Sequence, residues 1–281
     1  MYDNESQGDV ASQAESLIQK HNVTQDDFGW EIPVSTVPVP SEGKVYPQNS
    51  SIYGRSTLDI KAMTAREEDI LTSAALIRQG TVLNHLIQSC LIDKNVSIDD
   101  MLLGDRNALM VAVRITGYGA SYGVQASCPE CAEQSEQNFD LAELEIKRLE
   151  IEPVIEGENR FSFTLPITKK EVHFKFLTGK DEREMSVVAD RKKKLMPGSQ
   201  VESQVTSRLE HVILSIDGVE DRNKVNSFIK NMPALDSRKL RTYIESHEPG
   251  IDMAAWMSCP HCSESSQISM PLGINFFWPR D

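Results

Sequence analysis

The spacing of hydrophobic residues between positions 51 and 119 predicts one strand followed by a group of short helices. Residues 56–63 alternate as a strand does, and Thr64 with Glu67 then forms a capping box that opens a helix. The predicted helical segments are Thr64 to Gly80, Thr81 to Leu91, a short element that begins at Ser97 with Asp100, and a segment that Asp105 caps and that runs to Gly117. This part of the chain is therefore expected to form an α-helical lobe.

Beyond Gly119 the pattern alternates again and predicts two β-hairpins before helices return. Residues 120–127 read as a strand with a return segment through Phe139, and residues 161–165 and 172–176 predict a second hairpin. Apolar residues at helical spacing then predict helices over residues 181–195, 201–216, 224–231 and 236–245. Residues 251–257 and 267–270 predict the strands of one more hairpin near the end.

The first fifty residues have a different pattern. Residues 1–22 carry a narrow apolar stripe on a polar background, which predicts a short polar helix of marginal stability. From Val23 to Ser50, prolines alternate with apolar residues, and each proline removes a backbone donor and favours extended conformations. The segment from Trp30 to Pro47 is therefore expected to run extended across a surface, its own or a neighbour's, and not to pair as a central strand.

Composition and charge narrow the function classes. With 281 residues and 40% hydrophobic content, the chain can bury a substantial core. Its 42 acidic residues against 29 Lys and Arg give a net charge of −13, which argues against a general nucleic-acid binder. The basic run Arg191 to Lys194 is interpreted as the solvated end of a helix. No apolar run approaches the roughly 20 residues that a membrane span needs.

Four cysteines carry the strongest chemical signal. Cys128 and Cys131 enclose a Pro-Glu step, and Cys259 and Cys262 enclose a Pro-His step. Each pair can present two thiolates from a tight turn, and two such knuckles supply the four tetrahedral ligands that Zn²⁺ prefers. The sequence therefore predicts one structural zinc site, in which two segments far apart along the chain are held together.

Disulfides, redox chemistry and free thiols remain alternatives for these cysteines. Residues 1–23 are polar and have no apolar signal-peptide core, so a reducing cytoplasm is expected, which disfavours disulfides. A redox Cys-x-x-Cys motif normally occurs once and before a helix, not twice on hairpins. Cys90 lies within an apolar helical pattern and is expected in the core. His261 could replace a thiolate ligand but is expected to point to solvent.

Other chemistry has little support in the sequence. The chain shows no Gly-rich phosphate loop and no His-Glu-x-x-His helix, and its acidic residues form no recognisable acid–base pair, so no catalytic residues are predicted. The end of the chain, Phe276-Phe277-Trp278-Pro279, is unusually aromatic. These side chains either cover the protein's own core or dock on another subunit.

These patterns predict an α+β fold with three regions. Residues 1–50 form an N-terminal polar segment and a proline-rich extended arm, and residues 51–119 form a strand and the helical lobe. Residues 120–281 form a split four-cysteine zinc ribbon, whose halves are residues 120–140 and 251–270. A β-hairpin and helices, residues 141–250, are inserted between its two knuckles, and an aromatic tail follows.

The order of these landmarks resembles the baseplate hub and hub-assembly proteins of T4-like contractile-tail bacteriophages. The resemblance covers nearly all of residues 32–280, and residues 1–31 have no counterpart. It rests on the proline-rich Val39 to Pro47, Gly104-Asp105 in the helical lobe, Arg114 to Gly119 running toward the first knuckle, Asp236 to Gly250, and the second knuckle with its Phe-Phe-Trp-Pro tail.

The resemblance implies a structural or assembly protein without enzymatic activity. Its implied partners are other baseplate and tail proteins and copies of the chain itself, but not nucleic acid. Its implied location is the host cytoplasm during assembly and then the tail baseplate of the virion. A zinc-ribbon nucleic-acid or transcription-type module is the main alternative, although acidic residues such as Glu133, Glu136 and Glu264 follow the knuckles. An enzyme is a weaker alternative, because four thiolates leave no open metal position.

Overall fold

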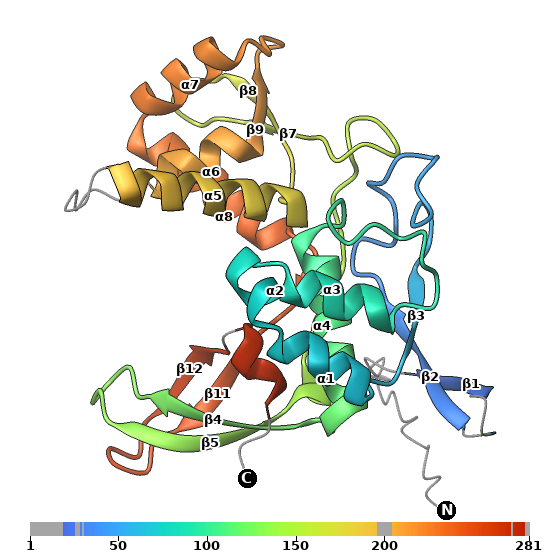
Figure 1. The fold of residues 1–281 in the computed structure, drawn as a ribbon. Helices are drawn as coiled ribbons and strands as arrows, with labels where there is room; N and C mark the ends of the chain where they lie inside the picture. The colour runs from blue at the N-terminus through green and yellow to red at the C-terminus, as the bar shows by residue number, and fades with distance from the viewer. Residues whose placement is uncertain (1–18, 26–28, 30, 196–203, 271, 279–281) are drawn as a thin grey trace, which may run out of the picture.

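A computed structural model describes residues 19–25, 29, 31–195, 204–270 and 272–278. The fold is α+β, as predicted. Helices α1 to α4 occupy the middle of the molecule, a small N-terminal sheet lies to one side of them, and two long hairpins extend below them (Figure 1). A second group of helices with its own small sheet lies above. None of the helices in the described ranges is both long and apolar enough to cross a bilayer.

The N-terminal sheet corrects two predictions. It contains β1 (Gln19–Gln25), β2 (Glu31–Pro38) and β3 (Thr57–Lys61) in antiparallel order β1-β2-β3. The prediction of a polar helix over residues 1–22 is wrong for residues 19–22, which belong to β1, and the rest of that prediction lies outside the described residues. The prediction that the arm does not pair as a central strand is also wrong in part, because β2 is the central strand of this sheet despite its prolines. Pro33 and Pro38 still have carbonyl acceptors, and the Pro33 carbonyl accepts the Ala62 N–H at 3.1 Å.

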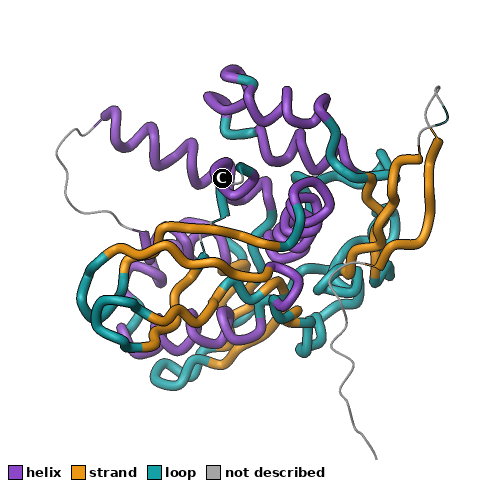
Figure 2. Tube along the Cα trace, turned by 90° about the horizontal axis from the view of Figure 1, so that it is seen from below, coloured by secondary structure: helices purple, strands orange, loops and turns teal. Residues whose placement is uncertain are grey.

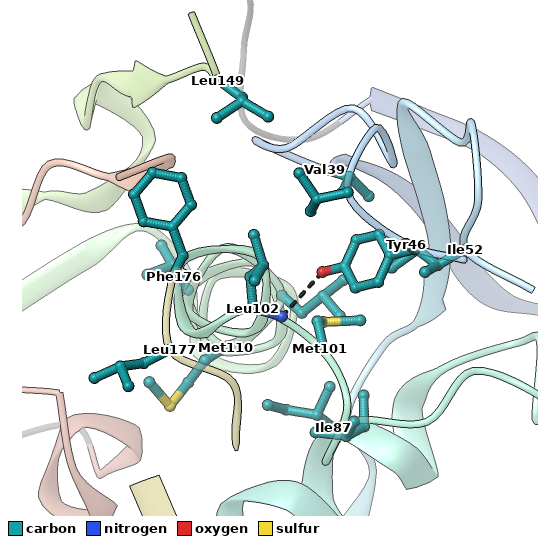
Figure 3. Close-up of a cluster of buried hydrophobic side chains, with 14 of the residues drawn as sticks. Val39, Tyr46, Ile52, Ile87, Met101, Leu102, Met110, Leu149, Phe176 and Leu177 are labelled. Atoms are coloured by element: carbon teal, nitrogen blue, oxygen red, sulfur yellow. Dashed lines mark hydrogen bonds between the residues drawn. The ribbon is translucent and has the colours of Figure 1, made fainter. Parts of the chain in front are cut away.

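The rest of the arm packs against the protein's own core. After β2, residues 39–54 form a series of turns in which Val39, Val45 and Tyr46 are buried. In Figure 3, Val39 and Tyr46 face the same cluster as Leu102 of the helical region and Phe176 of the inserted segment. The Tyr46 hydroxyl accepts the Leu102 N–H at 2.9 Å. The expected contact with a surface is therefore confirmed, and the surface is the chain's own.

The helical lobe largely follows the sequence pattern. Its helices are α1 (Ala65–Thr72), α2 (Ala74–Gln79), α3 (Val82–Cys90) and α4 (Leu103–Tyr118). The first predicted helix is divided at Ser73, and Gly80 ends its second half in the left-handed conformation that glycine accommodates best. The helical element expected from Ser97 is wrong, because residues 98–100 form a turn. Cys90 is fully buried, as predicted.

Asp105 does not cap α4, contrary to prediction. It lies inside the first turn and is 1% exposed. Its carboxylate accepts the backbone N–H of Ser41 at 2.8 Å, and the hydroxyls of Ser41 and Tyr46 at 2.5 Å each. Burial raises the pKa of this carboxyl, although the hydrogen bonds from Ser41 and Tyr46 oppose that rise. Asp105 therefore attaches the proline-rich segment to the start of α4.

Glu67 is the residue from which we expect a pH dependence of stability. Its buried carboxylate accepts hydrogen bonds from Lys61 at 2.8 Å, from Ser89 at 2.6 Å and from the Thr64 N–H at 3.0 Å. The bond from Thr64 completes the predicted capping box. Burial raises the pKa of Glu67, but the bonds from Lys61, Ser89 and Thr64 outweigh it and lower the pKa to about 2.

Because the folded-state pKa of Glu67 is depressed, its contribution to stability is present above the ordinary value of 4.5 and is lost as pH falls toward 2. We expect Glu67→Gln to lower the free energy of unfolding at pH 7, and the difference from wild type to shrink between about pH 5 and pH 2. Urea unfolding of both proteins across this range measures the difference. A difference that stays constant with pH would contradict the assignment.

In its described residues, the inserted segment contains a three-stranded sheet and four α-helices. Its strands are β7 (Phe161–Thr164), β8 (Glu171–Phe174) and β9 (Ile213–Ile216), in antiparallel order β7-β8-β9, so the predicted second hairpin is confirmed. The helices are α5 (Gly179–Leu195), α6 (Gln204–Val212), α7 (Arg222–Asn231) and α8 (Ala234–His247). The helix predicted over residues 201–216 is wrong over its last four residues, which form β9, and its first three lie outside the described residues.

The aromatic end of the chain belongs largely to the protein's own core. The short 3-10 helix η2 (Ile274–Phe277) carries Phe276 and Phe277, both fully buried, while Trp278 is 37% exposed. The buried guanidinium of Arg114 donates to the Phe276 carbonyl at 3.1 Å, and also to the carbonyls of Gly119 and Ser121. The alternative that the two phenylalanines dock on another subunit is therefore wrong, because α4 and the first hairpin cover them.

We expect Phe276→Ala to destabilise the protein by roughly 3–5 kcal/mol, because it leaves a cavity where the ring packs against Tyr122 at a centroid distance of 5.0 Å. Trp278→Ala is the matched control and should cost less than about 1 kcal/mol, since its side chain is partly in solvent. Urea unfolding midpoints compare the two variants. A loss for Phe276→Ala as small as the one expected for Trp278→Ala would mean that the burial of Phe276 contributes little to stability.

Candidate metal centre

Two β-hairpins carry the four cysteines, as predicted. The first contains β4 (Ser121–Ser127) and β5 (Gln134–Asp140), and the second contains β11 (Ala254–Ser258) and β12 (Ser265–Ser269). Ala126 and Met257 from the two hairpins share one small core with Cys128 and Cys259, and Phe139 and Ile268 pack against it. The hairpins therefore meet through their apolar faces, and their turns bring the cysteines together.

The two knuckles repeat the same backbone geometry. The N–H of Cys128 donates to the Glu133 carbonyl at 2.9 Å, and the N–H of Cys259 donates to the Glu264 carbonyl at 2.9 Å. In each knuckle the residue after the second cysteine has φ of 61°, and its N–H donates to the carbonyl of the first cysteine. These residues are Ala132 and Ser263. Two turns of identical form thus face one another from segments more than 120 residues apart.

The four sulfur atoms form one cluster. All of them lie within 4.8 Å of one another, and the Sγ atoms are 3.7 Å apart between Cys128 and Cys262 and between Cys131 and Cys259. A tetrahedral Zn²⁺ with bonds of about 2.3 Å separates its sulfur ligands by about 3.8 Å, so the cluster has the size that zinc requires. A disulfide needs about 2.05 Å, far less than these separations.

The surroundings favour the thiolate at Cys259, whereas at Cys131, despite a hydrogen bond from the Glu133 backbone N–H, burial and the neighbouring sulfurs raise the pKa of the thiol to about 12. The backbone N–H groups of Cys262 and His261 point at the Cys259 sulfur and, against the effect of burial, lower the pKa of that thiol to about 6. Cys128 and Cys259 are each 2% exposed, whereas Cys131 and Cys262 are partly exposed. His261 is exposed, as expected. Donors aimed at sulfur are the interactions that orient metal-bound thiolates, so this donor set fits a metal with four sulfur ligands.

Comparison with known proteins identifies the family. The family model described as T4 bacteriophage base plate protein matches residues 33–278. The chain belongs to that family. A search of curated proteins and a search of solved structures each gave no match. The matched range agrees with the resemblance seen in the sequence, and members of this baseplate family are generally structural proteins and not enzymes.

The part matched to the baseplate family includes both knuckles and everything between them. At the base of the ribbon, β6 (Ile146–Lys147) pairs with β10 (Gly250–Ile251), so the two ends of the inserted segment are joined there. Residue Gly250 of β10 also lies against Gly104 of α4. The inserted segment is therefore closed twice, by backbone pairing at β6 and β10 and by the cysteine cluster at the turns.

Glu133, Glu264, Ala132 and Ser263 were not predicted as parts of the knuckles. The signal for them is present in the sequence, because Cys-Pro-Glu-Cys-Ala-Glu and Cys-Pro-His-Cys-Ser-Glu share one pattern over six residues. The left-handed position in each falls on Ala or Ser and not on Gly or Asn, the usual markers of such a turn. The carbonyl acceptors are backbone groups, which any residue can supply.

A cleft with a volume of about 590 Å³ lies between α5, α6 and α7. Its lining is charged, but its cations already have partners. Lys175 pairs with Asp181 at 2.6 Å, and Arg160 pairs with Glu220 at 3.1 Å. Arg222 donates to backbone carbonyls at the end of α6. This cleft therefore adds no candidate site.

Proposed function

We propose that this chain is a structural or assembly component of a contractile phage tail baseplate, in the hub or next to it. We further propose that Cys128, Cys131, Cys259 and Cys262 bind one structural Zn²⁺. Family membership supports the baseplate role, and the convergence of four sulfurs from distant segments supports the metal site. The expected partners are other baseplate and tail proteins, met in the host cytoplasm during assembly and retained in the virion tail.

A structural role for the metal follows from the positions of its ligands. Bound zinc would supply four strong bonds between the two hairpins and no free position for substrate. Residues Cys128 and Cys131 then fix the start of the inserted segment, and Cys259 and Cys262 fix its end. With β6 and β10 paired, the helices and sheet of that segment are held in one orientation relative to α4. A rigid adaptor with several faces suits a protein that joins other subunits.

The exposed acidic residues of the ribbon oppose the nucleic-acid alternative. Glu130, Glu133, Glu136 and Glu264 are exposed around the knuckles, and residues 120–145 and 251–270 contain no Lys or Arg. Such a surface repels phosphate, whose attraction supplies the first part of nucleic-acid affinity.

Two measurements test the proposal. Elemental analysis of protein purified without chelators should find one zinc per chain, and protein without zinc would contradict the metal assignment. For the baseplate role, phage lacking a functional copy of this chain should accumulate incomplete tails, and mass spectrometry of purified virions should detect the chain. Normal infectious particles without this chain would contradict the role, whatever the metal content.

A further inference from the structure

The two hairpins around the cysteines carry charge of one sign only. We define the acidic ribbon as residues 120–145 and 251–270, which contain no Lys or Arg and account for −8 of the net charge of −13. Its eight acidic residues are all exposed: Glu130, Glu133, Glu136, Asp140, Glu143, Glu145, Asp252 and Glu264. None of them forms an ion pair with another described residue, whereas acids elsewhere on the surface often do. The ribbon therefore projects an uncompensated negative field.

An aromatic side chain lies within this field. Trp256 on β11 is 70% exposed, the largest exposure of any big hydrophobic side chain in the described ranges. It is paired across the hairpin with Gln267, on the face that points away from β4 and β5. Its neighbours on that face, Ala254 and Ser258, are small. A tryptophan this exposed is typical of a protein contact and not of a core.

Helix α5 offers the complementary surface. The four consecutive residues Ser186–Ala189 are all exposed, and four residues span a full helical turn, so no face of the helix is covered there. Val187 and Val188 are 44% and 40% exposed. In sequence, α5 then ends on Arg191 to Lys194, the longest run of cations in the chain. An uncovered helix of this kind gains little from packing, which indicates that a partner covers it.

We propose that the acidic ribbon of one copy binds α5 of a second copy, at the exposed residues Ser186–Ala189 and at the cations Arg191 to Lys194 that follow them in the sequence. Opposite charges draw the two surfaces together, and Trp256 meets Val187 and Val188. Both the ribbon turns and the end of α5 point toward the same side of the molecule (Figures 1 and 2). A two-fold axis on that side would therefore form the contact twice and close a symmetric dimer. The proposal needs the fold of the ribbon but not the baseplate role.

Charge-reversed variants of the full-length chain test this contact by sedimentation velocity. Wild type should dimerise with rising concentration, and raising NaCl from about 0.05 M to about 0.5 M should weaken the dimer. Glu133→Lys with Glu136→Lys, and separately Lys192→Glu with Lys193→Glu, should each raise the dissociation constant by about ten-fold or more. Trp256→Ala should also weaken the wild-type dimer.

Asp69→Lys with Glu150→Lys is the matched control, since it changes net charge equally at exposed positions outside both surfaces. It should leave the dissociation constant within about two-fold of wild type. Circular dichroism and zinc content confirm that each variant is folded, which separates a lost contact from a lost ribbon. A wild-type chain that stays monomeric at every concentration would overturn the proposal. So would dimers that both reversed variants form as well as wild type does.

Discussion

Cys259→Ser is expected to abolish zinc binding and unfold the part of the acidic ribbon around the knuckles while the rest of the protein keeps its fold. This part has little else to hold it: its small core is Ala126, Met257 and two of the cysteines, whereas Tyr122, Leu141 and Met270 at the base of the ribbon pack into the main core. An isolated two-stranded hairpin is marginal in water, and here two such hairpins depend on each other. Structural zinc sites contribute on the order of 10 kcal/mol of apparent binding energy, so this loss exceeds any single packing change.

Zinc analysis with limited proteolysis measures this outcome. The variant should contain no zinc, and new cleavage sites should fall within the ribbon close to the knuckles. Cys90→Ala is the control, because Cys90 is buried away from the cluster and should not affect metal content. A Cys259→Ser protein with full zinc content and wild-type protease resistance would show that the cluster does not depend on all four thiolates.

The cysteine cluster was predictable because its information is local. Each knuckle is a motif of four residues, and each hairpin alternates with period two, so both could be read without knowing any long-range contact. That the two knuckles meet was inferred from matched spacing and the ligand number of zinc, and the sulfur cluster agrees. The capping box at Thr64 and the end of α2 at Gly80 are local signals of the same kind.

The errors occur where long-range contacts determine the structure. Residues Ile213 to Ile216 follow α6 directly and fit helical spacing, but pairing with β8 makes them a strand. Four residues are too few for the two periods to be distinguished. Asp105 has the position of a cap, yet its partners Ser41 and Tyr46 are about sixty residues away. No local pattern predicts that a polar residue will be buried by a distant segment.

The prediction for the proline-rich arm was wrong for a related reason. Prolines lower the probability of a central strand on average, but a strand loses only the bonds that would use the missing N–H groups. In β2, Val34, Val37 and the following Val39 are buried, and this apolar burial outweighs the missing donors. The position of the aromatic tail was not predictable from local sequence either, since Arg114 and Tyr122 form its binding position only in the folded state.

Gly104→Ala is expected to destabilise the whole protein, by on the order of 4 kcal/mol or more. A Cβ at position 104 would lie 1.7 Å from the Pro249 carbonyl oxygen and 2.9 Å from the Gly250 Cα. Both are backbone atoms, so no side-chain rotation relieves the overlap. Alanine favours a helix over glycine by about 1 kcal/mol, which the overlap should far exceed. Either α4 or β10 must move, and that movement opens the base of the ribbon.

Gly123→Ala is the control for this substitution. Gly123 lies in β4, and a Cβ there meets nothing within 4 Å, so the change should be within about 0.5 kcal/mol of wild type. Urea unfolding followed by circular dichroism compares both variants, and zinc content reports the ribbon. Because β10 leads directly into the second knuckle, Gly104→Ala should also weaken metal retention. An unchanged midpoint for Gly104→Ala would mean that α4 and β10 do not pack this closely in solution.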